Sequence, residues 1–296
     1  KHTFTEFAQR MKNDEMITLA KFLAISGIIL PMLPHKNLIP DINLTPYSIW
    51  LATVVVSGIS YLSYLLKRYV FHESGVLVSG IIGGLYSSTA TISVLARKSR
   101  KASEQEANEY VAAMLLAVSM MFLRFMILIL IFSREIFTSI YPYLLIMSVV
   151  AAVVAWFIHS RHRRSKDMTD ESEDEDSSNP LEFKVALIFA TLFVVFTVLT
   201  HYTLVYAGTG GLNLLSFVSG LSDITPFILN LLQNTGSVAV LVVVACSMQA
   251  IISNILVNMF YALFFAGKGS KLRPWILGGF GTVIGVNLVL LLFFYL

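Results

Sequence analysis

The chain has 296 residues, of which 56% are hydrophobic and only 13% are charged, and its mean hydropathy is +0.75. Soluble domains do not carry repeated apolar runs of about 20 residues, so this composition predicts an all-α polytopic membrane protein. The single cysteine, Cys246, excludes a disulfide within the chain. The formal net charge is only +3, and we expect the lipid bilayer rather than a nucleic acid as the partner.

Seven apolar stretches predict full membrane spans, at residues 16–33, 46–66, 110–132, 140–159, 183–204, 237–266 and 274–296. Two further segments, 74–96 and 208–233, are interrupted by small and polar residues. Each interruption follows a Val-Ser-Gly tripeptide, at 78–80 and at 218–220. Each segment fits either a full crossing or a re-entrant hairpin of two half-helices.

The distribution of positive charge favours hairpins, because Lys and Arg are retained in cytoplasmic loops. Two full crossings would divide the Lys and Arg residues outside the spans evenly between the two faces. Two hairpins would bring all of them to one face except Lys36 and Arg134. This arrangement predicts a cytoplasmic N-terminus, an external C-terminus and two halves of opposite orientation, as in inverted-repeat transporters.

The expected organisation has four parts. They are a cytoplasmic segment (1–15), a first membrane half (16–159) with hairpin 74–96, a charged cytoplasmic linker (160–181) and a second half (182–296) with hairpin 208–233. The linker starts basic and turns acidic, which is typical of a solvated loop. The span at 16–33 lies outside the repeat and is the candidate interface of a homodimer. We expect the protein in the cytoplasmic (inner) membrane of a prokaryote.

Hairpin tips at membrane depth require a surrounding cavity, because irregular backbone is not tolerated against lipid. Half-helix N-termini at such tips present free N–H groups that favour anions. The candidate solute- or ion-binding residues at the two tips are Ser87, Ser88, Thr89 and Thr91 in the first and Ser222, Asp223 and Thr225 in the second.

Polar residues within the neighbouring spans extend this candidate site. A side chain such as Arg124 must face the bundle interior, where it either binds an anionic substrate or neutralises Asp223. Asp223 is the candidate carrier of a coupling proton and the candidate ligand of a metal cation. The spacing of five between Ser119 and Arg124 recurs in the second half, whose candidate residues are Ser253, Asn254 and Asn258.

Several stretches in order along the chain resemble the membrane family catalogued as domain of unknown function 4010. They are residues 31–34, 56–60, 80–91, 121–124, 179–180 and 221–223, of which the Gly-Gly-x-x-Ser-Ser-Thr-Ala segment is the most specific. The resemblance implies an upstream MgtC/SapB-type domain, absent from this chain, and a link to magnesium physiology. Members of the family carry a second motif of the type Ala-Asp-Val-Asp-Ala, whereas Thr225 replaces its second acid here, so a carboxylate pair is not expected.

These features predict an ion-coupled secondary transporter of a small anionic solute, with its site at the two hairpin tips. The candidate coupling ions are H⁺ and Na⁺, and no bound cofactor is expected. The alternatives are a divalent cation (Mg²⁺) transporter and a non-transporting membrane sensor or regulatory subunit. We do not expect an enzyme, because the chain has no His-Glu-x-x-His or Gly-x-Ser-x-Gly motif.

Overall fold

The computed structural model describes residues 13–40, 42–71, 75–100, 102, 104–160, 183–233, 238–267 and 270–295. All regular elements within these ranges are helices, which confirms the expected all-α class. The expected segment 1–15 and linker 160–181 lie largely outside the described residues. The elements are α2 (Asn13–Met32), α3 (Pro46–Leu65) with a π-helical end η1 (Leu66–Val70), α4 (Val76–Lys98), α5 (Glu104–Phe132), α6 (Arg134–Ser160), α7 (Phe183–Ser219), α8 (Ile224–Gln233), α9 (Val240–Ala266) and α10 (Arg273–Tyr295).

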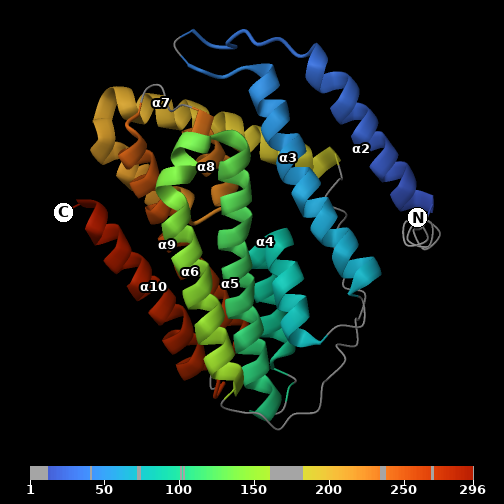
Figure 1. Ribbon diagram of the computed structural model, residues 1–296, viewed down its shortest axis with the longest axis vertical. Coiled ribbons are helices and arrows are strands. Elements are labelled where there is room, and N and C mark those ends of the chain that lie inside the picture. Colours follow the sequence, from blue (N-terminus) through green and yellow to red (C-terminus); the bar gives the residue numbers. More distant parts are fainter. Residues whose placement is uncertain are drawn as a thin grey trace.

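Seven of the described helices are long and apolar enough to cross a membrane, so the chain is a multi-pass membrane protein. Six of them correspond to the spans expected at 46–66, 110–132, 140–159, 183–204, 237–266 and 274–296. The seventh is α4, which covers the ambiguous segment 74–96. The span expected at 16–33 corresponds to α2, which lies at the edge of the bundle (Figure 1) and whose apolar part, Met16–Met32, is shorter than the seven spanning helices.

Helix α5 forms the centre of the bundle, since its side chains from Val111 to Leu115 are completely buried. It stands beside α6 (Figure 1), and two serines exchange hydrogen bonds between these helices. The Ser119 hydroxyl donates to the Ser148 carbonyl at 2.8 Å, and the Ser148 hydroxyl donates to the Ser119 carbonyl at 3.2 Å. Such bonds hold helices together where lipid surrounds them and supplies no hydrophobic drive.

Helix α4 is broken at Ser87, where the backbone is extended (φ −158°, ψ 107°). Beyond this residue the chain folds back on itself. A Cβ atom added at Gly83 would lie less than 3.0 Å from the Thr91 side chain. Residues eight apart in a continuous helix are separated by about 12 Å, so this contact requires two arms packed side by side.

The first arm of α4 packs closely on α5 through small residues spaced four apart. Gly80 lies against Ala113, and Gly84 lies against Ala117. Because the two pairs run in the same order along both helices, the first arm is parallel to α5. Both ends of α4 therefore lie at the end of the bundle where α5 begins, the lower end in Figure 1.

The second interrupted segment, 208–233, contains two breaks. The first is at Gly208 within α7, whose positive φ (φ 59°, ψ −154°) is readily adopted only by glycine. The second is the non-helical stretch 220–223, which separates the end of α7 from α8. The polar interruption predicted to follow Gly220 is therefore a true break in the helix.

Helix α8 lies at the other end of the bundle. The Asn230 amide donates to the Thr200 hydroxyl of α7 at 2.7 Å. At the end of α8, the Gln233 carbonyl accepts a hydrogen bond of 3.2 Å from the Asn43 amide, in the segment that joins α2 to α3. In Figure 1 this segment lies at the top of the bundle and α4 lies in its lower part. The two broken segments thus occupy opposite ends.

The close contact of α4 with α5 gives a prediction for Gly80→Ala. Alanine stabilises an open helical position by about 1 kcal/mol relative to glycine. At Gly80, however, an added Cβ would lie less than 3.0 Å from the backbone of Ala113, and such overpacking costs about 1–3 kcal/mol. We expect a lower melting temperature for the purified protein in detergent. The matched control is Gly281→Ala in α10, where no atom lies within 4 Å and the melting temperature should stay equal or rise.

Candidate functional site

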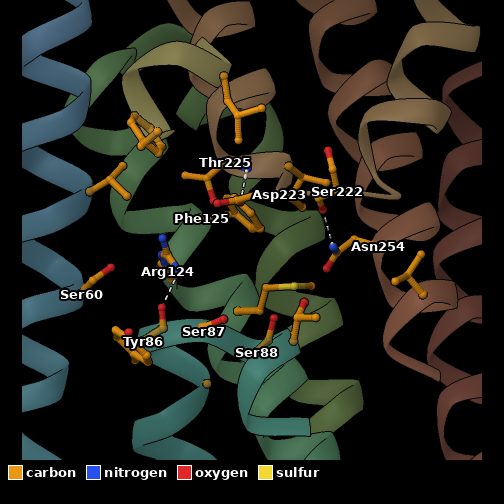
Figure 2. Close-up of a pocket in the computed structure, with 18 of the residues that line it drawn as sticks. Ser60, Tyr86, Ser87, Ser88, Arg124, Phe125, Ser222, Asp223, Thr225 and Asn254 are labelled. Carbon is orange, nitrogen blue, oxygen red and sulfur yellow. Dashed lines mark hydrogen bonds between the residues drawn. The ribbon is translucent and has the colours of Figure 1, made fainter. Parts of the chain in front are cut away.

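The breaks in α4 and after α7 meet at a cavity of about 380 Å³ (Figure 2). Its walls come from α3, α4, α5, α7, α8 and α9 and from the stretch between α7 and α8. Arg124 and Asp223 are the two charged residues among those that line it. Both side chains point into the space between the breaks (Figure 2).

At the α4 break, the two newly formed helix ends are satisfied by different partners. The Arg124 Nη1 group of α5 donates to the Tyr86 carbonyl, at the end of the first arm, at 2.8 Å. The Ser87 hydroxyl accepts a hydrogen bond from the Ala90 N–H at 3.3 Å, which is the bond of a helix N-cap. Arg124 therefore supports the end of one arm while Ser87 starts the next.

At the second break, the same two tasks fall to other residues. The Asn254 amide of α9 lies 3.3 Å from the Gly220 carbonyl and 3.4 Å from the Ser222 carbonyl, and donates to both. The Asp223 carboxylate accepts a hydrogen bond from the Thr225 N–H at 2.9 Å, so Asp223 is the N-cap of α8. The Asp223 side chain nevertheless stays exposed to the cavity.

The charges of Arg124 and Asp223 attract each other across the cavity. Each makes its observed hydrogen bond to a backbone group, Tyr86 or Thr225, rather than to the other residue. Two half-helix N-termini, after Ser87 and after Asp223, add partial positive charge to the same space. One carboxylate therefore faces one guanidinium and two helix N-termini, a balance that favours an anion.

Most of the residues predicted for the site are brought together by the fold. Those that line the cavity are Ser87, Ser88, Thr89, Arg124, Ser222, Asp223, Thr225 and Asn254.

The other three predicted site residues lie behind the cavity wall. Thr91 packs against Gly83 between the arms of α4, and Ser253 packs against Gly220. Asn258 is completely buried and donates to the Asn254 side-chain oxygen at 3.1 Å. Arg124 and Asn258 thus make different contacts despite their matching positions in the sequence.

Further lining residues did not stand out from the sequence. Ser57 and Ser60 of α3 lie one turn apart, a spacing that was visible in the printed sequence. The apolar wall from the first part of α7 carried no such signal, because apolar residues occur on every face of that helix. Its members in the cavity are Val185, Ile188, Phe189 and Leu192.

Substitutions of Asp223 separate its charge from its capping bond. Asparagine caps helices about as well as aspartate, whereas loss of an N-cap costs about 0.5–2 kcal/mol. We expect Asp223→Asn to melt close to the wild-type protein and Asp223→Ala to melt lower, in the same detergent. Equal melting of both variants would show that the bond to Thr225 does not stabilise α8.

Comparisons with known proteins agree with the resemblance noted in the sequence. The chain is 27% identical over 221 residues to an uncharacterized protein of Aquifex aeolicus (strain VF5), a match that covers 74% of this chain and 94% of that protein. No solved structure matches the chain significantly. The profile of the family described as "Domain of unknown function (DUF4010)" matches residues 54–266, which include both breaks and the whole candidate site, and the chain belongs to that family.

Proposed function

We propose that the protein is an ion-coupled secondary transporter of a small anionic solute in the cytoplasmic membrane. In this proposal the ends of α4 face the cytoplasm, and the two broken segments are re-entrant hairpins of an inverted repeat. Each arm of α4 has roughly 11 residues and a length of about 16 Å, half of the roughly 30 Å of a hydrocarbon core. Broken segments at opposite ends that meet in a central cavity are typical of secondary transporters.

The observation that carries the proposal is the state of Arg124. Within the described residues, its guanidinium makes one hydrogen bond, to the Tyr86 carbonyl, and its Nε atom is buried without a partner. Leaving a buried charged donor unsatisfied costs more than leaving a neutral one. An oxyanion in the cavity would accept hydrogen bonds from the guanidinium N–H groups that face it (Figure 2), because planar guanidinium groups match carboxylate and phosphate oxygens.

The size and lining of the cavity suit a small organic anion. Its volume of about 380 Å³ lies at the lower end of the range of ligand pockets. Polar groups are supplied by both breaks, and apolar side chains, including Phe125 of α5 and Phe189 of α7, supply much of the remaining wall. We therefore place a carboxylate against Arg124 and an apolar part of the solute against these aromatic rings.

Asp223 is the candidate coupling residue. It is the one acidic side chain among the residues that line the cavity, and it is exposed there. A proton or a Na⁺ ion bound at Asp223 would remove its repulsion of an anion held by Arg124. Binding of the two would then be mutually favourable, which is the thermodynamic basis of cotransport.

Transport of Mg²⁺ is the second candidate, and it rests on the same exposed carboxylate. Mg²⁺ binds through one or two carboxylates and retains several waters, and Asp223 with the Ser222 and Thr225 hydroxyls offers such oxygens. Arg124 would repel this ion, so we rank the anion first.

In a sensor that does not transport, the same cavity would bind a solute without moving it across the membrane.

A melting-temperature series tests the anion site directly. The purified protein is scanned with the sodium salts of succinate, lactate, phosphate and chloride at constant ionic strength, and with MgCl₂. A ligand that binds only the folded state raises the melting temperature by mass action. We expect a carboxylate to stabilise the wild type and Arg124→Gln to weaken this binding at least about tenfold, which corresponds to about 1.4 kcal/mol.

Two further variants keep this test independent of folding. Arg124→Lys retains a donor for Tyr86 and should fold, but it lacks the planar fork and should bind the carboxylate more weakly. Arg134→Gln removes an exposed arginine at the start of α6 and should bind as the wild type does. Stabilisation by MgCl₂ alone, lost in Asp223→Asn, would replace the anion proposal by the cation one.

Proteoliposomes test the role of Asp223 in coupling. The radiolabelled solute is the carboxylate that raises the melting temperature most. Its uptake into the proteoliposomes is measured with an imposed proton or Na⁺ gradient across their membrane. We expect Asp223→Asn, which retains the helix cap, to lose gradient-driven accumulation but to keep exchange of labelled for unlabelled solute. Accumulation at the wild-type level would assign coupling to another residue, and the absence of uptake and exchange by the wild type would favour the sensor.

A further inference from the structure

A second cavity, of about 400 Å³, lies at the end of the bundle opposite α8. Its described lining residues follow the end of α4, lie near the beginning of α5, or lie at the end of α9 and around the start of α10, and none of them lines the candidate solute site. These parts come from both halves of the chain. Arg100 joins them, since its Nη2 group donates to the Phe264 carbonyl at 3.2 Å.

The described residues that line this cavity include two cations, Arg100 and Lys271, and no acid. Both cations are exposed. The cavity is therefore suited to an anionic group.

A polar side chain of α5 lines the same cavity. Asn108 is only 5% exposed and contributes to the cavity wall. A side-chain amide can both donate and accept hydrogen bonds. A ligand with several oxygen acceptors would accept a hydrogen bond from this amide in addition to its contacts with the two cations.

The position of the cavity identifies the class of ligand. It lies where α9 ends at Ala266 and α10 begins at Arg273, at the limit of two apolar helices, and Trp275 contributes to its wall. Tryptophan is enriched at the level of lipid headgroups, and basic pockets between membrane helices bind the headgroups of acidic lipids. We propose that this cavity binds a phosphate group, for which an acidic phospholipid is the expected source and free phosphate the other.

Such a ligand would stabilise the contact between the two halves of the chain. It would connect Arg100, at the base of α4, with Lys271, at the base of α10. Its binding is independent of which solute occupies the central cavity, so the two sites are tested separately.

The test uses the full-chain protein in micelles that contain either phosphatidylcholine alone or a fraction of phosphatidylglycerol. Native mass spectrometry counts the bound lipid, and thermal unfolding measures its effect; inorganic phosphate is titrated in parallel. We expect phosphatidylglycerol to raise the melting temperature of the wild type and Arg100→Gln/Lys271→Gln to weaken its binding at least tenfold. The matched control is Lys36→Gln/Arg134→Gln, which removes the same two residue types from exposed positions at the other end.

Two single variants cover the case in which the double variant does not fold. Lys271→Gln keeps the bond between Arg100 and Phe264, and Asn108→Asp places a carboxylate where the phosphate would lie; both should weaken binding. Stabilisation by inorganic phosphate alone, with the same dependence on these residues, would support the site and name free phosphate as its source. Equal loss in the control pair, or no effect of either compound on the wild type, would overturn the proposal.

Discussion

The architecture depends on one constraint, which is that a helix interrupted inside an apolar bundle leaves backbone groups that lipid cannot satisfy. Each break exposes the carbonyls of one arm and the N–H groups of the next. Arg124 and Ser87 serve the α4 break, whereas Asn254 and Asp223 serve the break after α7. The chemistry of the cavity follows from these four side chains, because each both stabilises a helix end and lines the space between the breaks.

The two breaks are similar in construction but differ in charge. Ser87 and Asp223 are both N-caps, and the glycine that packs on the adjacent helix lies three residues before each, at Gly84 and Gly220. When the two breaks are aligned on their N-caps, Gly84 corresponds to Gly220. When they are aligned on the repeated Val-Ser-Gly tripeptides, Gly80 corresponds to Gly220 instead. The two alignments differ by four residues, about one helical turn. The positive group serves one break and the negative group the other, and this difference gives the cavity its polarity.

The sequence was sufficient to locate the breaks but not their partners. Small and polar residues such as Gly80 and Asp223 interrupt apolar runs, and a charge such as Arg124 must face the interior, so both features are visible locally. The sequence did not show that Asn254, rather than Asn258, donates to the Gly220 carbonyl at the second break. Both asparagines lie on one face of α9, and only the distance from each side chain to that carbonyl decides between them. The α7 wall was missed for a similar reason: its position depends on the direction that the chain takes at Gly208, and apolar residues alone do not reveal which face meets a cavity.

The candidate site draws on two groups of helices, and this bears on the proposed transport cycle. Arg124 belongs to α5, against which the first arm of α4 packs, whereas Asp223 lies in the stretch between α7 and α8 and Asn254 belongs to α9. In that cycle, movement of α4 and α5 as one unit against α7, α8 and α9 as the other would change the distance between the guanidinium and the carboxylate. A solute bound to Arg124 and a cation bound to Asp223 would each alter the attraction between the units, and a ligand can shift such an equilibrium only by its difference in affinity for the two states. Coupling therefore requires no contact between solute and ion, since both act on the same pair of charges.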